Sequence, residues 1–182
     1  FRHSFPTRRS SDLTTPEILE KLSAQEIFSD FSEKNEENKR ILTNVCQILT
    51  VQDFAAGETI ITEGEEGDAL YILFKGKVQV LRNTPGNEQF AVVNLATEQN
   101  VFFGEIALID HDRRSASVRA LTDCSTLKLS GQDFINLCEK EPLLGYRALF
   151  RIAKRIAASL RRSTKDILTL YEALLDEVDS GS

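Results

Sequence analysis

The middle of the chain, residues 47–130, is a succession of short β-branched and aromatic runs, and this pattern limits the possible folds more than any other feature. Turn-forming Gly, Pro, Asn and Asp residues separate the runs, most densely at residues 63–68 and 84–87. Many short strands at this spacing predict an antiparallel sandwich or barrel. The runs are ILTVQDF (48–54), TIIT (59–62), ALYILF (69–74), KVQVL (77–81), EQFAVVNL (88–95), SASVRAL (115–121) and STLKLS (125–130).

Helical patterns flank this β segment on both sides. Residues 14–46 are polar, with apolar residues at helical spacing and Pro16 where a first helical residue is expected, which predicts two or three short helices. A short helix is expected at 131–140 and a long one at 142–178, so that the C-terminal helices occupy 131–178. The apolar positions of the long helix recur at threes, fours and sevens: Leu149, Ile152, Ile156, Leu160, Ile167, Leu170 and Leu174. A chain of 182 residues is long enough for one domain with a sizeable core.

The first thirteen residues, FRHSFPTRRSSDL, fit nothing that follows. They resemble the conceptual translation of a sequencing-library adapter, so residues 1–13 are expected to be a non-native prefix and are excluded from the fold prediction. On this interpretation the native N-terminus is missing. The alternative is a genuine disordered tail rich in arginine and serine.

Composition argues against several classes of function. The formal net charge of −6 argues against a surface that binds nucleic acids. No apolar run approaches the roughly 18 residues of a membrane span, so no membrane segment is expected. The cysteines Cys46, Cys124 and Cys138 are odd in number and widely spaced, which predicts reduced thiols in a cytoplasmic protein.

Enzymatic activity is not expected either. The chain has two histidines, His3 in the prefix and His111, so the multi-histidine metal site of cupin-type enzymes cannot be built. His111 stands in a polar Asp-His-Asp loop and is expected to be solvated rather than a ligand. No P-loop or dinucleotide-binding signature occurs. We therefore expect no catalytic residue, no metal and no cofactor.

Residues 103–120, F-G-E-I-A-L-I-D-H-D-R-R-S-A-S-V-R-A, combine residue types suited to a cyclic nucleotide, which presents a ribose 2′-hydroxyl and a singly charged phosphate. Glu105 offers an acceptor for the hydroxyl, and Arg114 offers a forked guanidinium that stays charged when buried. Gly104 lets the backbone approach closely, and a helical turn at 106–109 would aim N–H groups at the phosphate. Small residues leave room beside the ring: Ser115, Ala116 and Ser117.

On these residues the chain resembles the cyclic-nucleotide-binding domain family, which includes the cAMP-dependent kinase regulatory subunits, nucleotide-gated channels and the bacterial catabolite activator protein. Residues 103–120 are similar to its phosphate-binding cassette, and residues 60–76 match its pattern I-x-x-E-G-x-x-G-D-x-L-Y-I-L-x-x-G. The resemblance covers residues 47–160. It implies an eight-stranded antiparallel jelly-roll barrel (a double-stranded β-helix) with N-terminal helices and a long C-terminal helix. One departure is Asn100, where the family usually has Gly; Asn tolerates a left-handed backbone better than most residues.

The resemblance also implies a role for individual residues. The position of Glu105 binds the ribose 2′-hydroxyl, and that of Arg114 binds the cyclic phosphate. Backbone amides complete the phosphate cradle at Gly104, Ala107 and Ser115. Ser159 falls where the long helix of the catabolite activator protein meets adenine. The expected cAMP-binding residues are therefore Gly104, Glu105, Ile106, Ala107, Arg114, Ser115, Ala116 and Ser159.

The identity of residue 115 bears on the choice of ligand. Kinase regulatory subunits often have Ala there, and cGMP-selective members tend to have Thr, whose hydroxyl reaches the guanine. The catabolite activator protein has a Ser in a similar R-S-A-x-V-R-A context, and its hydroxyl serves the phosphate. With Ser115, cAMP is expected to be favoured over cGMP.

The expected function is that of a regulatory or sensor domain that couples the binding of a cyclic nucleotide to movement of its C-terminal helix. Apolar positions of that helix extend to Leu174, farther than a lone barrel can cover, which predicts a homodimer through the helix. Two alternatives stay open. In the first, the chain is a fragment of a larger cyclic-nucleotide-regulated protein, such as a transcription regulator, channel or kinase. In the second, it is a degenerate member of the family that binds no nucleotide.

Overall fold

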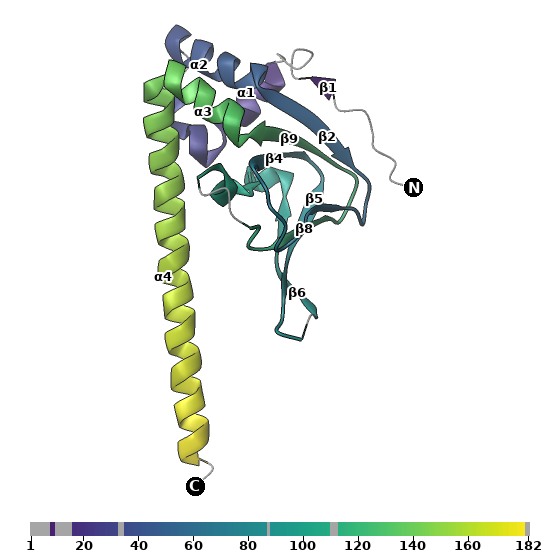
Figure 1. Cartoon of the computed structure of the whole chain (residues 1–182), viewed down its shortest axis with the longest axis vertical. Coiled ribbons are helices and arrows are strands. Elements are labelled where there is room, and N and C mark those ends of the chain that lie inside the picture. Colours follow the sequence, from purple (N-terminus) through teal and green to yellow (C-terminus); the bar gives the residue numbers. More distant parts are fainter. Residues whose placement is uncertain (1–7, 10–15, 33–34, 87, 110–112, 181–182) are drawn as a thin grey trace.

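The computed structural model describes residues 8–9, 16–32, 35–86, 88–109 and 113–180, and it packs helices from both ends of the chain together on one side of a β-rich body (Figure 1). The N-terminal helices are α1 (Pro16–Ser23), η2 (Glu26–Phe31) and α2 (Glu36–Gln47). The helix α2 begins at Asn35, whose side chain accepts a hydrogen bond from the Asn38 N–H at 2.8 Å. The predicted two or three short helices are confirmed.

The strands of the described residues form two sheets in which every pairing is antiparallel. The larger sheet has the order β1-β2-β9-β4-β7, with β1 (Arg8–Arg9), β2 (Leu49–Phe54), β9 (Cys124–Ser130), β4 (Ala69–Lys75) and β7 (Phe102–Phe103). The smaller sheet has the order β3-β8-β5-β6, with β3 (Thr59–Ile61), β8 (Ser117–Ala120), β5 (Lys77–Asn83) and β6 (Gln89–Ala96). The antiparallel β fold with flanking helices is confirmed, whereas closure into an eight-stranded barrel stays a prediction.

Two of these strands were not expected from the sequence. The strand β7 is only two residues long, too short to produce a recognisable alternation. Arg8 and Arg9 of the N-terminal thirteen residues form β1, which pairs with Thr50 and Val51 of β2. The origin of those thirteen residues stays a prediction.

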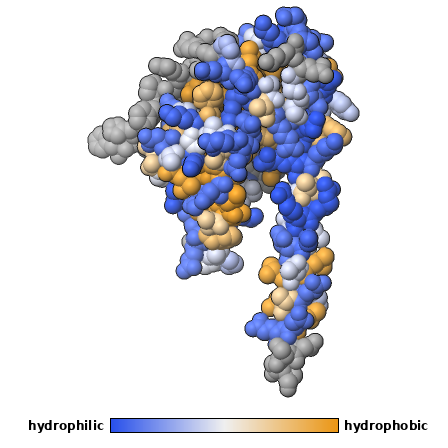
Figure 2. Space-filling model, turned by 180° about the vertical axis from the view of Figure 1, so that it is seen from behind, coloured by the Kyte–Doolittle hydropathy of each residue, from blue (hydrophilic) through white to orange (hydrophobic). Residues whose placement is uncertain are grey.

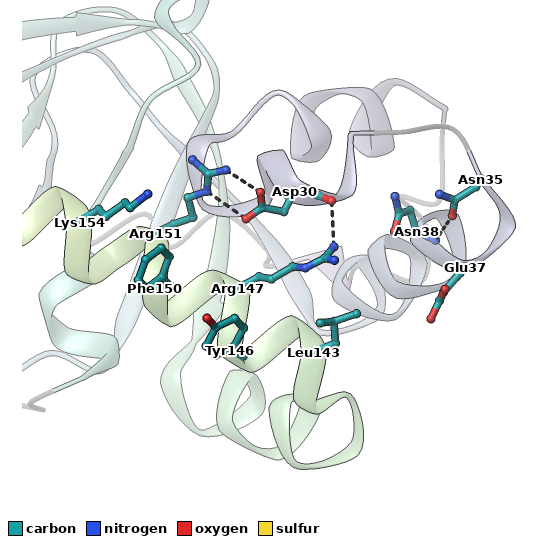
Figure 3. A pocket seen from close by; sticks show the side chains of 10 residues that line it. All are labelled: Asp30, Asn35, Glu37, Asn38, Leu143, Tyr146, Arg147, Phe150, Arg151 and Lys154. Atoms are coloured by element: carbon teal, nitrogen blue, oxygen red, sulfur yellow. Dashed lines mark hydrogen bonds and ion pairs between the residues drawn. The ribbon is translucent and has the colours of Figure 1, made fainter.

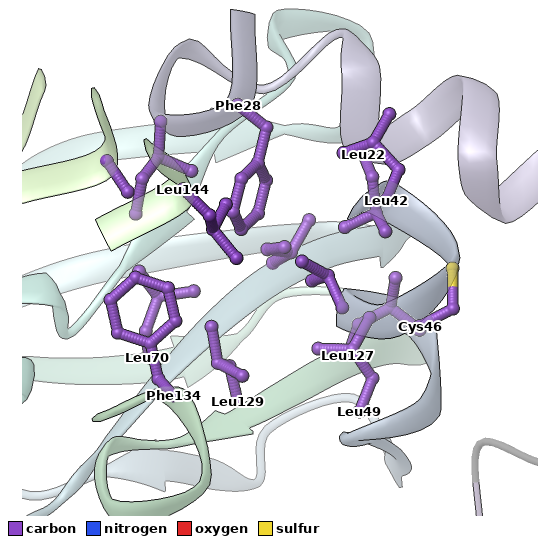
Figure 4. Close-up of a cluster of buried hydrophobic side chains, with 14 of the residues drawn as sticks. Leu22, Phe28, Leu42, Cys46, Leu49, Leu70, Leu127, Leu129, Phe134 and Leu144 are labelled. Atoms are coloured by element: carbon purple, nitrogen blue, oxygen red, sulfur yellow. The ribbon is translucent and has the colours of Figure 1, made fainter. Parts of the chain in front are cut away.

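The hydrophobic core has two parts, separated by the larger sheet. The helix-side core lies between that sheet and the helices and includes Phe28, Leu70 and Phe134 (Figure 4). The inter-sheet core lies between the two sheets and includes Tyr71 and Val118. The strand β4 contributes alternate residues to both, because successive side chains of a strand point to opposite faces. This explains why its apolar run is nearly continuous rather than alternating with polar residues.

The chain ends in two helices, α3 (Gly131–Lys140) and α4 (Pro142–Ser180). The helix α4 has 39 residues and is therefore about 58 Å long at 1.5 Å per residue. Its first turns are anchored in the helix-side core by Leu144, Ala148 and Ile152, whereas its distal part extends well beyond the sheets (Figure 1). Of the helices in the described ranges, none is long and apolar enough to cross a membrane.

Polar contacts also join α4 to the N-terminal helices (Figure 3). Arg151 donates two hydrogen bonds to the Asp30 carboxylate, at 2.6 and 3.0 Å, and Arg147 donates one to the Asp30 carbonyl oxygen at 3.1 Å. The hydrogen bonds from Arg151 lower the pKa of Asp30. A cavity of about 570 Å³ lies beside this contact. The start of α4 is thus held by charge as well as by apolar packing.

Candidate ligand-binding site

The guanidinium of Arg114 is fixed by two backbone carbonyls. It donates hydrogen bonds to the Gly104 oxygen at 3.1 Å and to the Ala69 oxygen at 2.8 Å. Burial lowers the pKa of Arg114 from its usual value, and Tyr71 and Asp68 act in the opposite direction. The pKa of arginine starts so high that the group keeps its charge at neutral pH. Arg114 is therefore a half-buried, positioned cation.

Two glycines make room for this cation. A Cβ atom added to Gly67 would lie 2.0 Å from Nε of Arg114, and one added to Gly104 would lie 2.7 Å from a terminal nitrogen of the same side chain. Gly104 also has a left-handed backbone, with φ of +79°. From the sequence, Gly104 is predicted to belong to the site, whereas the glycines at 63–68 are interpreted only as turn residues. For Gly67 that interpretation was incomplete, because its bare backbone borders the guanidinium.

Gly104 leads directly into a single helical turn, η4 (Glu105–Leu108). The predicted turn at 106–109 is therefore present, one residue earlier. Glu105, its first residue, has a side chain that is only 15% exposed, and its Oε1 forms an ion pair at 3.0 Å with Nε of Arg155. Arg155 belongs to α4, so the C-terminal helix reaches the predicted ribose-binding carboxylate.

Arg155 makes three contacts around this turn. Besides the ion pair with Glu105, it donates a hydrogen bond to the Phe102 carbonyl at 3.2 Å, and its guanidinium carbon lies 4.2 Å from the centre of the Phe102 ring. The sequence analysis did not predict this role. A signal was available in the spacing, since Arg155 precedes Ser159 by four residues and therefore shares its helix face.

These elements enclose a cavity of about 310 Å³, at the lower end of the roughly 300–1,000 Å³ of small-molecule sites. Seven of the eight predicted site residues line it: Gly104, Glu105, Ile106, Arg114, Ser115, Ala116 and Ser159. The eighth, Ala107, lies in η4. Other parts of the wall come from β3, β5 and β6, with Ile61, Val80, Val93 and Leu95. A second hollow of about 350 Å³ adjoins it along α4 and shares Glu105, Ile106, Arg155 and Ser159.

Two further residues discussed from the sequence are not among the described residues that line this cavity. Ser117 was expected beside the ring, but it is buried and its hydroxyl accepts a hydrogen bond from the Glu63 N–H at 2.9 Å, so that prediction was wrong. Strand β8 begins at Ser117, which turns its side chain into the body of the domain. His111 lies outside the described residues.

Thiols and metal-binding side chains were the other groups of chemical interest in the described residues. Cys46, Cys124 and Cys138 carry free thiols, and burial raises the pKa of Cys46 and Cys138 to about 11. In the described ranges, no group of three or more His, Cys, Asp or Glu side chains could hold a metal ion. The cavity around Arg114 is lined by both charged and apolar side chains of the described residues.

The segment that contains most of this cavity is similar to known proteins. The family model of the cyclic nucleotide-binding domain matches residues 51–141. Human cGMP-dependent protein kinase 2 is 42% identical over 79 residues, which cover 43% of this chain and 10% of the kinase. The cyclic AMP receptor protein of Thermus thermophilus is 31% identical over 103 residues, or 57% of this chain and 47% of that protein. The crystal structure of the Thermus thermophilus catabolite activator protein matches with a TM-score of 0.66 and 27% identity, over 80% of this chain and 63% of that chain.

The chain thus spans less than two thirds of each of these relatives. The matched residues 51–141 make up half of the chain, and they contain both glycines that border the guanidinium, Arg114 itself and Glu105. Since the match has this extent and includes the centre of the cavity, the chain belongs to the cyclic nucleotide-binding domain family.

Proposed function

We propose that this domain binds cAMP, in preference to cGMP, in the cavity between Arg114, Glu105 and α4. One observation carries the proposal: a half-buried cation and a carboxylate, expected to bind the phosphate and the ribose, line a single cavity with Ser159 of the C-terminal helix. Arg114 would pair with the phosphate through its forked donors, and Glu105 would accept a hydrogen bond from the ribose hydroxyl.

The proposed preference for cAMP rests on the apolar part of the cavity wall, with Val80, Val93 and Leu95. A base that lay against these side chains would find no partner for the extra polar groups of guanine. Ser115 lies on the cavity and is exposed, within the R-S-A context of the catabolite activator protein. The relatives point to both ligands, because one is named for cyclic AMP and another for cGMP.

We also propose that the nucleotide controls the docking of α4. The Glu105 carboxylate is held by Arg155 of that helix, and it is also the expected acceptor for the ribose hydroxyl. A carboxylate can accept several hydrogen bonds, so both partners can be bound together. Each would then stabilise the orientation that the other needs, and the nucleotide would shift an existing equilibrium toward the docked helix.

Hydrogen–deuterium exchange tests binding and coupling in one experiment. Addition of cAMP is expected to slow amide exchange at residues 105–117 and also at residues 145–165, at lower concentrations than cGMP requires. With Arg155→Met the first effect should persist and the second should disappear, because the link to Glu105 is gone. Arg161→Met, between one and two turns farther along α4, is the matched control. Protection of 105–117 in the wild type without any change at 145–165 would rule out signalling through α4.

The distal part of α4 leads to a proposal about assembly. Apolar residues are exposed along this part of the helix (Figure 2). Five of them are more than half exposed and recur at the spacing of one helix face: Leu160, Ile167, Tyr171, Leu174 and Val178. Their intervals of seven, four, three and four residues are those of a coiled-coil seam. We propose that a second copy of the chain covers this seam.

Sedimentation equilibrium measures this assembly directly. The wild type is expected to sediment at least partly as a dimer, and Leu174→Glu as a monomer, because the new charge lies in the middle of the seam. Thr169→Glu introduces the same charge on the opposite face of the helix and should leave the dimer intact. A wild-type chain that is monomeric throughout would refute the dimer. The cytoplasmic location and the output of the domain in a longer protein remain expectations.

A further inference from the structure

Asn100 occupies an unusual backbone conformation close to the cavity. It caps the short helix η3 (Thr97–Gln99) with φ of 49° and ψ of 54°, in the left-handed region that side-chain-bearing residues seldom adopt. Among the described residues it is the only non-glycine with a positive φ. Four residues later the chain reaches Gly104, whose carbonyl accepts a hydrogen bond from Arg114.

A lysine from the N-terminal helix α1 holds this turn. The Lys21 ammonium donates hydrogen bonds to the Thr97 carbonyl at 2.7 Å and to Oδ1 of Asn100 at 3.0 Å. On the other side, the Thr97 N–H and hydroxyl donate to the Gly76 carbonyl at 3.3 and 2.8 Å. The turn is therefore fixed between α1 and the loop that joins β4 to β5.

Lys21 is partly buried where its ammonium contacts the Thr97 carbonyl, whereas its contact with Asn100 lies at the surface. Desolvation lowers the pKa of Lys21, and the nearby Glu98 raises it. A partly buried ammonium needs hydrogen-bond acceptors, and the two oxygens of the turn provide them. The contact joins residues that are 76 and 79 positions apart in the chain.

Three residues that pair with β4, from Val101 to Phe103, connect the turn to Gly104 at the cavity. The Val101 carbonyl accepts a hydrogen bond from the Leu73 N–H at 3.1 Å. Phe102 and Phe103 then pair with β4, and Gly104 follows directly. A change in the direction of the chain at Asn100 would alter the register of this two-residue strand, and with it the carbonyl that orients Arg114.

We propose that Lys21 is a positioning residue for nucleotide binding, which keeps Asn100 left-handed and so holds β7 and Gly104 in place beside Arg114. The inference rests on the proposed function of the cavity. Lys21 touches no part of that cavity, so its effect on affinity is transmitted through the turn. Through this turn, Lys21 connects the N-terminal helix to the binding site.

Four variants test the inference by calorimetric titration with cAMP. Lys21→Met, which keeps the length of the side chain and removes its donors, is expected to weaken binding about three- to tenfold. Asn100→Gly should bind like the wild type, because glycine adopts the left-handed region unaided. In the Asn100→Gly background Lys21→Met should cause no further loss. Lys39→Met, the same change on the exposed face of α2, is the matched control and should have no effect.

The outcomes separate the inference from its alternatives. Unchanged affinity in Lys21→Met would overturn it, and so would an equal loss in both backgrounds, since Lys21 would then act by another route. Amide exchange at residues 101–105 in the ligand-free protein gives a second readout: Lys21→Met should accelerate it only where Asn100 is present. If the wild type binds no cyclic nucleotide, the proposed function fails, and this exchange measurement alone decides whether Lys21 positions β7.

Discussion

Replacing Arg114 with alanine is expected to weaken the binding of cAMP at least about tenfold, or about 1.4 kcal/mol. The guanidinium is held by the Gly104 and Ala69 carbonyls, so little further ordering of this side chain would be needed when the phosphate binds. Without it, the bound phosphate would lose the forked guanidinium that lies beside Gly67 and Gly104, and charge-assisted forked contacts are the strong class of hydrogen bond. Calorimetric titration of both proteins measures the difference.

The same experiment needs a control for the fold. Arg119→Ala removes an arginine from the neighbouring strand β8, where its guanidinium donates a hydrogen bond to Gln89 at 2.9 Å. This variant should bind cAMP like the wild type. Thermal unfolding should show both variants folded at the temperature of the titration. Equal affinities for the wild type and Arg114→Ala would mean that the phosphate lies elsewhere.

The second large effect is expected for Glu105→Ala, measured with cAMP and with its 2′-deoxy analogue. The wild type should prefer cAMP, since only cAMP offers the hydroxyl that Glu105 is proposed to accept. In the variant this preference should disappear, mainly through loss of affinity for cAMP. The comparison of two ligands in two proteins isolates that single contact.

Glu105 has a second partner, and variants separate the two roles. Arg155→Ala removes the ion pair with Glu105 but leaves its carboxylate in place, so the preference for cAMP over the deoxy analogue should persist. Glu105→Gln keeps an acceptor oxygen and should retain part of the preference. If Glu105→Ala lowers the affinity for both ligands equally, the residue acts structurally, through Arg155 and α4.

Most of the secondary structure could be predicted because its signals are local. The predicted runs at 59–62, 69–74 and 125–130 correspond to β3, β4 and β9, and the short helix at 131–140 is α3. The left-handed conformation accepted for Asn100 is also observed. Such features depend on the preferences of a few consecutive residues, so they can be recognised in the sequence alone.

The features that the sequence did not predict correctly concern residues whose roles depend on packing. Strand β7 exists because Phe102 and Phe103 pair with Ile72 and Tyr71 of β4, which no pattern within two residues reveals. Ser117 faces Glu63 rather than the cavity because strand β8 begins there. In both cases the deciding neighbour lies 30 or more positions away in the chain.

The sequence by itself determined the β-rich middle, the flanking helices and the membership of Glu105 and Arg114 in one site, because strand spacing and the composition of residues 103–120 carry that information. Only the tertiary structure decided which groups surround these two side chains. Arg114 is oriented by Ala69, 45 residues distant, and Glu105 is held by Arg155 of α4. Lys21 reaches Asn100 across 79 residues. These contacts arise when segments far apart in the chain pack together, and a linear pattern cannot specify which distant side chain will occupy a given position.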